Sequence, residues 1–220
     1  MVKSFFDGPD YAYEAKWPSD TIVIGVDEAG RGPWAGPVVA AAFWINPIAL
    51  DMMPAGLTDS KKLSALARAK IEAELLAQPH VFGVGSVSAE NIDELGLLPA
   101  TFKAMDRAVG ALMAQFSHPV AAILVDGNLK PDLPSANGAE TETIIKGDAK
   151  SLSIAAASIM AKEDRDRQMC ELDKLYPEYG FAGHKGYGTK AHRQALELYG
   201  PCPQHRRSFR PIQALISADD

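Results

Sequence analysis

Residues 22–32 read IVIGVDEAGRG, an apolar run that ends in two neighbouring acids and an arginine flanked by glycines. The run predicts a buried strand with Asp27 and Glu28 at its end. Carboxylates there are costly to bury unless a cation or a hydrogen-bond donor satisfies them. Neighbouring strand side chains face opposite ways, so both acids can serve one site only where the strand ends or deforms. The pair alone fits a solvated strand end as well as a divalent-metal site beside a phosphate-bearing ligand.

Asp126 repeats this arrangement, because it follows the apolar run VAAILV at 120–125 and precedes Gly127. An ordinary Asp-Gly turn is the alternative interpretation. If the two strand ends lie side by side, Asp27, Glu28 and Asp126 meet. Their oxygens suit Mg²⁺ or Mn²⁺, and no Cys/His spacing indicates zinc.

Apolar runs and helical periodicity alternate along the chain. They predict strands near 21–28, 37–45, 80–87, 120–126 and 141–146. They predict helices near 64–77, 99–116, 151–175 and 189–199. In the first of these helices, Arg68 and Glu72 fall on positions that we expect to be exposed. This interleaving indicates an α/β sheet with helices packed on it.

The composition is that of a globular chain. Its 220 residues, 47% of them apolar, can bury a full core, and no apolar run approaches a membrane span. Residues 1–20 lack a signal-peptide pattern and predict a short, partly ordered leader. Cys170 and Cys202 form no disulfide framework or metal pattern, which favours a cytoplasmic location.

Positive charge gathers near the C-terminus of an acidic chain. Between residues 183 and 210 there are six Lys/Arg and one acid, a local charge of +5 within a net charge of −6. Such a segment predicts a surface that follows phosphates, or a solvated cluster of charges. Arg206 and Arg207 are our candidates for phosphate contact.

Seven motifs resemble those of type 2 ribonuclease H, ribonuclease HII, and they occur in that family's order across roughly residues 20 to 212. They are DEAGRGPWAGP at 27–37, DSKKLS at 59–64, VDG at 125–127, KGDAKS at 146–151, AAASI at 155–159, HKGYGT at 184–189 and GPCP at 200–203. The resemblance implies a ribonuclease H-like mixed β-sheet flanked by helices, with a helical C-terminal appendage. The expected division is a leader at 1–20, a catalytic domain at 21–180 and a basic helical segment at 181–220.

In this resemblance, Asp148 of the Lys-Gly-Asp motif joins the three strand-end acids in a four-carboxylate site that is both catalytic and metal-binding. Asp164 and Asp166 compete with it, but their mixed charge run is typical of a solvated helix face. The implied chemistry is phosphodiester hydrolysis assisted by two Mn²⁺ or Mg²⁺ ions, giving 5′-phosphate and 3′-hydroxyl ends. The implied substrates are RNA–DNA hybrids and duplex DNA containing single ribonucleotides. We expect the protein to be a monomer and not to associate with a membrane.

Selecting RNA requires contact with a 2′-hydroxyl. The backbone of Gly30, Arg31 and Gly32 is one candidate, and the Arg31 guanidinium can also hold a phosphate. Tyr187 is the other candidate, since its ring can stack on the sugar after a ribonucleotide. The alternative is that Tyr187 is a core aromatic near a turn.

Other residues have weaker patterns. Lys61 and Lys62 are expected to contact phosphate or to belong to a solvated loop. The three histidines of the basic segment have no metal-ligand spacing, and we expect them at the surface or on a phosphate; they are His184, His192 and His205. Trp34 is expected to border the site.

Three rival functions stay open. A ribonuclease HIII-like enzyme is expected to carry an N-terminal domain for which the leader is too short. A hybrid-binding module without activity would not need four acids. A DNA-directed nuclease would share the carboxylates but not the glycine-flanked motifs that we assign to ribose recognition.

Overall fold

A five-stranded mixed sheet forms the centre of the computed structural model, which describes residues 8–217. The strand order is β3-β2-β1-β4-β5, with β1 antiparallel to β2 and parallel to β4. The strands are β1 Ile22–Ala29, β2 Val38–Trp44, β3 Val81–Val87, β4 Val120–Asp126 and β5 Glu140–Ile144. The predicted α/β class and mixed sheet are confirmed.

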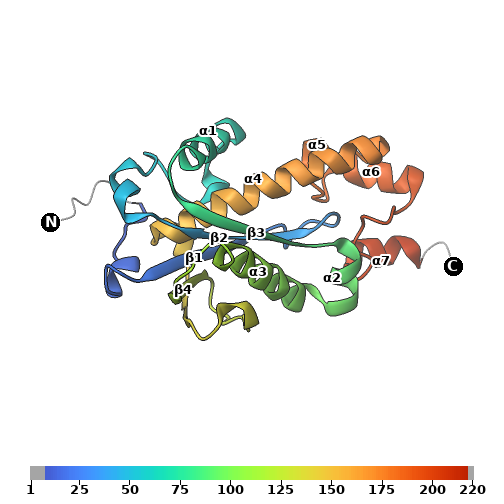
Figure 1. Ribbon diagram of the computed structural model, residues 1–220. Coiled ribbons are helices and arrows are strands. Elements are labelled where there is room, and N and C mark those ends of the chain that lie inside the picture. Colours follow the sequence, from blue (N-terminus) through green and yellow to red (C-terminus); the bar gives the residue numbers. More distant parts are fainter. Residues whose placement is uncertain (1–7, 218–220) are drawn as a thin grey trace.

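Helices cover both faces of this sheet, with α3 on one side and α1 and α4 on the other (Figure 1). The helices are α1 Ala65–Leu76, α2 Ala89–Leu95, α3 Leu97–Met113, α4 Leu152–Leu175, α5 Phe181–His184, α6 Lys190–Tyr199 and α7 Arg210–Ile216. Helices α5 to α7 gather beyond one end of the sheet, as a C-terminal appendage. No helix among residues 8–217 is long and apolar enough to cross a membrane.

The helix α2 was not predicted. It has seven residues, begins where the Ser88 side chain accepts from the Asn91 N–H, and ends at Gly96, whose φ is 84°. A helix of two turns shows too little of a 3.6-residue period to be read from the sequence. The single helix expected at 99–116 is therefore preceded by a separate short one.

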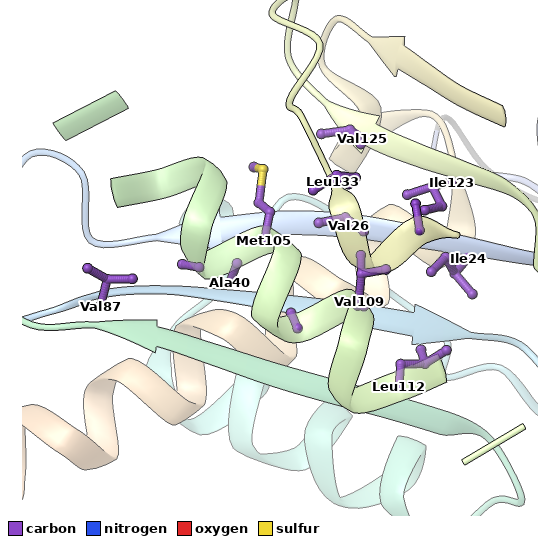
Figure 2. Close-up of a cluster of buried hydrophobic side chains, with 14 of the residues drawn as sticks. Ile24, Val26, Ala40, Val87, Met105, Val109, Leu112, Ile123, Val125 and Leu133 are labelled. Atoms are coloured by element: carbon purple, nitrogen blue, oxygen red, sulfur yellow. The ribbon is translucent and has the colours of Figure 1, made fainter. Parts of the chain in front are cut away.

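The core is divided between the two faces of the sheet by strand alternation. Figure 2 shows the α3 face, where Ile24 and Val26 of β1 pack with Val109 of α3. On the opposite face α4 lies directly on β1, because a Cβ at Gly25 would stand 2.3 Å from the Ile154 nitrogen. This close approach fixes α4 against the strand that carries the first two acids.

The predicted exposure of Arg68 and Glu72 is wrong, since both are buried. Arg68 pairs with Glu163 at 2.7 Å and with Asp166 at 3.1 Å, while Glu72 accepts from Arg167 at 2.7 Å. Arg68 and Glu72 thus meet the charged run of α4 instead of water.

The described part of the leader fastens the start of α4. The Asp10 N–H donates to the Lys150 carbonyl at 3.1 Å, and the Asp10 carbonyl accepts from Leu152 at 3.0 Å. Buried Glu14 accepts from the Ser151 hydroxyl at 2.6 Å and from the Ser153 N–H at 2.9 Å. The rest of the leader, residues 1–7, and the last three residues of the expected basic segment lie outside the described residues.

Candidate active site

Asp27 and Asp126 lie on neighbouring parallel strands at one edge of the sheet. Their preceding residues, Val26 and Val125, are register partners and both face α3. The two acids therefore project toward the α4 side, about 5 Å apart in strand spacing. Asp27 is 3% exposed, and the nearby Ser158 hydroxyl on α4 favours its charged form.

Glu28 occupies the next position of β1, which does not deform there. The ladder with β2 continues regularly through Asp27, Glu28 and Ala29, whereas the ladder with β4 ends at Val26. The site therefore opens on the β4 side of β1. The Glu28 carboxylate lies 3.5 Å from the Arg31 guanidinium.

The Lys-Gly-Asp turn brings Asp148 to the same edge. The Gly147 N–H donates to Asp126 Oδ1 at 2.6 Å. A Cβ at Gly147 would stand 2.6 Å from the Ile154 side chain and 3.3 Å from Asp126 Oδ1, so a larger residue there would have to displace both side chains. Asp148 follows, 7% exposed, in the short helical turn Gly147–Ala149.

These four acids, which we call the carboxylate edge, influence one another electrostatically. Burial raises the pKa of Asp27 well above its usual value, and Glu28 and Asp126 raise it further. Burial also raises the pKa of Glu28, although Arg31 opposes the change, and burial followed by Asp126 raises that of Asp148. A divalent cation would reverse these shifts by favouring the charged carboxylates.

The donor set fits a hard cation, but the side chains do not surround a single point. Within residues 8–217, no three His, Cys, Asp or Glu side chains form a ready-made ion site. One oxygen of Asp27 accepts from the Glu28 N–H at 2.7 Å, and one of Asp126 is held by Gly147. Side-chain movement is therefore needed to bring the remaining oxygens onto an ion.

Lys61 lies close enough to the carboxylate edge to feel its charge. Burial alone would lower the pKa of Lys61, but Asp27, Asp148 and Asp59 outweigh it and the pKa is raised. The turn is anchored by a buried Ser60–Ser158 hydroxyl contact of 2.9 Å. Lys62 is exposed in the same turn.

Residues 30–37, the glycine-arginine loop, stand beside an exposed aromatic ring. Tyr187 is 48% exposed, which excludes the core-aromatic interpretation. A Cβ at Gly32 would lie 3.7 Å from the Tyr187 ring, so the two are neighbours. Trp34 lies against Gly188, where a Cβ would meet the indole at 2.1 Å.

Arg206 lies inside the protein, and its predicted contact with substrate phosphate is wrong. It is 0% exposed, and its guanidinium donates four hydrogen bonds to carbonyls of the glycine-arginine loop. The acceptors are Gly30 at 2.6 Å and Arg31, Gly36 and Pro37 at 3.0 Å each. Arg207 is exposed, and its backbone N–H donates to Asp93 at 2.7 Å.

A second buried guanidinium supports the same loop. Arg165 donates to the carbonyls of Pro37 and Lys185, each at 3.0 Å. Burial, followed by repulsion from Arg165, lowers the pKa of Arg206 to about 9. Gly30, at a φ of 93°, leaves room for this packing, because a Cβ there would stand 2.0 Å from Arg165 Nε.

The buried arginines orient the loop's peptide groups. In a planar trans peptide the C=O and the following N–H point in opposite directions. Because the Gly30 and Arg31 carbonyls point inward to Arg206, the N–H groups of Arg31 and Gly32 point away from it. The loop thus presents backbone donors next to the Arg31 side chain, which is 48% exposed.

Two of the three histidines were also misplaced by the sequence interpretation. His192 and His205 are buried, at 0% and 1% exposure, and are hydrogen-bonded to each other. His184 is half-buried, with its ring stacked on that of His192. None of the three lies on a free surface.

The family follows from the sequence comparison. The sequence model of the family "Ribonuclease HII" matches residues 24–212. The ribonuclease HII of Halorhodospira halophila is 52% identical over 195 residues, covering 88% of this chain and 94% of that one. This chain belongs to the ribonuclease HII family. Members of the family are enzymes that cleave RNA in RNA–DNA hybrids.

Solved structures agree with the fold. The ribonuclease H2 of Pyrococcus horikoshii is 27% identical, with a TM-score of 0.72, and the match covers 90% of this chain and 98% of that one. A Bst-RNase HIII structure in complex with Mn²⁺ is 21% identical, with a TM-score of 0.69, covers 90% of this chain and 70% of that one, and supports the fold alone.

Several residues around this ribonuclease HII site carried no recognisable signal in one sequence. Ser158 lies in an apolar helical run, and Arg165 lies in a run of mixed charge that usually marks a solvated face. Asp164 and Asp166, the rivals of Asp148, are engaged by Gln168 and Arg68 respectively. Those contacts occupy the two rival acids on α4 and favour Asp148.

Proposed function

We propose that this chain hydrolyses the RNA strand of RNA–DNA hybrids, and DNA duplexes at single embedded ribonucleotides, leaving 5′-phosphate and 3′-hydroxyl ends. The observation that carries the proposal is the placement of the carboxylate edge next to the glycine-arginine loop. The carboxylate edge provides acids for phosphodiester chemistry. In the glycine-arginine loop, carbonyls that point inward to Arg206 leave backbone N–H groups that point outward as donors. Membership of the family supports the reaction class.

The residues that would hold metal are Asp27, Glu28, Asp126 and Asp148. Two Mn²⁺ or Mg²⁺ ions bound there would supply an activated water and would offset charge on the leaving 3′ oxygen. All-oxygen donors and raised carboxylate pKa values fit hard divalent cations. Bst-RNase HIII, whose structure was determined in complex with Mn²⁺, shares the fold of this chain.

The protein's own cations would then position the substrate strand. Lys61 sits within the field of the carboxylate edge, so its ammonium can approach the scissile phosphate from that side. Arg31 presents an exposed guanidinium beside Glu28. Lys62 and Arg207, both exposed, would contact more distant phosphates.

Ribose selection would come from the glycine-arginine loop and Tyr187. The outward N–H groups of Arg31 and Gly32 are donors for the 2′-oxygen, which a deoxyribose lacks. The exposed Tyr187 ring lies against Gly32 and can stack on the following sugar. Both contacts favour a ribonucleotide junction over DNA alone.

One substrate set tests this function. A labelled DNA duplex with one ribonucleotide, the same duplex without it and a continuous hybrid are incubated with wild type and with Asp126→Asn. We expect cleavage beside the ribonucleotide and in the hybrid, and none in plain DNA. Cutting of plain DNA would favour a DNA-directed nuclease, and binding without cleavage by wild type would favour an inactive hybrid-binding module.

The preferred ion, the monomeric state and the cytoplasmic location stay predictions.

A further inference from the structure

Three histidines link the C-terminal appendage to the loop that carries Tyr187. His192 Nε2 and His205 Nε2 are 2.9 Å apart. The rings of His184 and His192 stack at 4.4 Å between centroids. None of these side chains takes part in the hydrolysis described above, and two are fully enclosed.

The neighbouring backbone fixes where each proton sits. The Cys202 N–H donates to His205 Nδ1 at 3.0 Å, so this nitrogen must be an unprotonated acceptor. Neutral His205 therefore carries its proton on Nε2 and donates to His192 Nε2. The longer 3.3 Å approach of His205 Nδ1 to the Cys202 carbonyl then carries no hydrogen bond.

The same reasoning reaches Tyr187 from the other side. A carbonyl oxygen can only accept, and His192 Nδ1 lies 3.0 Å from the Tyr187 carbonyl. His192 must then hold its proton on Nδ1, which leaves Nε2 free to accept from His205. The contact of His205 with Cys202 and the contact of His192 with Tyr187 independently require the same arrangement of protons, with both rings neutral.

Residues 184–188, the tyrosine loop, are held at successive backbone groups. His184 Nδ1 accepts from the Gly186 N–H at 3.2 Å, and His184 Nε2 donates to the Tyr179 carbonyl at 2.8 Å. Arg165 holds the Lys185 carbonyl. His192 contacts the carbonyl of Tyr187, and the Tyr187 ring stands beside Gly32.

We infer that His192, oriented by His205, is a positioning residue that holds the Tyr187 backbone and so sets where the Tyr187 ring meets the substrate. The inference rests on the proposed role of Tyr187 in substrate binding. His192 touches no substrate itself. Without the imidazole donor, the Tyr187 carbonyl keeps only the local hydrogen bond from the Thr189 N–H, and the ring loses its tie to helix α6 and with it a fixed position relative to the glycine-arginine loop.

Two variants of His192 separate positioning from packing. In His192→Asn the amide nitrogen falls near the position of Nδ1 and can still donate to Tyr187. In His192→Gln the amide falls near Nε2, which keeps a partner for His205 but leaves the Tyr187 carbonyl with only the hydrogen bond from the Thr189 N–H at 2.8 Å. Both variants lose the ring that stacks on His184, and the melting curves report the remaining difference in packing between them.

The measurement is KM and kcat on the single-ribonucleotide duplex, with melting curves and Tyr187→Ala in parallel. We expect His192→Gln to raise KM roughly tenfold, the scale of one lost hydrogen bond. We expect His192→Asn to stay within about threefold of wild type on the same scale. The rise in KM should be absent when His192→Gln is added to Tyr187→Ala, because the ring to be positioned is gone.

Equal changes in KM for His192→Asn and His192→Gln would overturn the positioning role. So would a normal KM for His192→Gln when Tyr187→Ala is impaired. A normal Tyr187→Ala would instead refute the proposed contact of Tyr187, leaving the histidine chain to be judged by nuclear magnetic resonance. Nitrogen-15 spectra at neutral pH should show His205 protonated on Nε2 and His192 on Nδ1. Any other tautomer, or an imidazolium, would contradict the chain whatever the activity.

Discussion

The carboxylate edge and the interior behind the glycine-arginine loop both bury ionisable groups, but they stabilise them differently. At the edge, like charges face one another and the pKa values of Asp27 and Asp148 are raised. Behind the loop, Arg165 and Arg206 are surrounded by backbone carbonyls. The negative charge of the carboxylate edge therefore needs a cation to compensate it, whereas the buried arginines behind the loop are satisfied by hydrogen bonds within the protein.

The largest effect should come from removing one member of the carboxylate edge. Asp126→Asn should lower kcat at least on the order of a thousandfold, because a metal-holding oxygen is lost. Its melting temperature should stay the same or rise, since like-charge repulsion is relieved. Asp132→Asn, at an exposed position, is the control. Near-normal cleavage by Asp126→Asn at saturating metal would remove Asp126 from the site.

Behind the loop, the two adjacent arginines should behave differently. Arg206→Ala should lower the free energy of unfolding by on the order of 3 kcal/mol or more, because four carbonyls lose a hydrogen bond from the guanidinium and only that of Pro37 keeps one from Arg165. Arg207→Ala should change stability by less than about 0.5 kcal/mol. It should reduce the slope of binding against salt by about one unit if it contacts one phosphate. Denaturant unfolding measures the stability of the two variants, and binding at several salt concentrations measures the slope. Equal destabilisation by Arg206→Ala and Arg207→Ala would refute the difference between the two arginines.

The two regions should also respond oppositely to acid. Burial lowers the pKa of both His192 and His205 from 6.5 to about 4, so the unfolded chain binds protons first as the pH falls. Stability from this pair, which also faces His184 and Tyr179, is full above about pH 6.5 and lost toward pH 4. The loss should be on the order of 3 kcal/mol for each histidine that becomes protonated.

At the edge the sign is reversed, because the raised pKa of Asp27 means that folding favours its protonated form. Unfolding measured from pH 7 to 4 in wild type, His192→Asn and Asp27→Asn separates the two. The histidine variant should show a shallower fall with acid and the aspartate variant a steeper one. Identical pH profiles in all three proteins would contradict this account.

Tyr187 should give a smaller effect that depends on the substrate. Tyr187→Phe keeps a stacking ring and should retain most activity, whereas Tyr187→Ala should lose on the order of 1–3 kcal/mol in kcat/KM. The loss should be greatest on a single embedded ribonucleotide, because a continuous hybrid offers further contacts to the glycine-arginine loop. Equal losses on both substrates, or a Phe variant as poor as Ala, would rule out stacking at the junction.

The sequence predicted the parts of the molecule that depend on local pattern. The run 120–125 followed by Asp126 predicted β4 with its observed ends, and the long helix was placed within a residue at its start. The meeting of Asp27 and Asp126 also followed from two strands ending in acids. Hydrophobic alternation and period are properties of the chain itself, so one sequence is enough to show them.

Burial of polar side chains was not predictable in the same way. Arg206 and Arg207 are adjacent in the sequence, yet one lies under the glycine-arginine loop and the other is exposed. His192 was expected at the surface because a lone histidine does not show which backbone group it meets. These positions depend on contacts between segments far apart in the chain, such as Arg206 and Gly30, which are separated by 176 positions.

The central contrast is tested most directly by adding metal to proteins that do no catalysis during the measurement. Thermal unfolding of wild type, Asp126→Asn and Arg207→Ala is followed while Mn²⁺ or Mg²⁺ is titrated in without substrate. A cation that completes the carboxylate edge should raise the melting temperature of wild type and Arg207→Ala with increasing metal, and Asp126→Asn should lose most of that rise. An equal rise in all three proteins, or none in wild type, would contradict the claim that the carboxylate edge holds the ion.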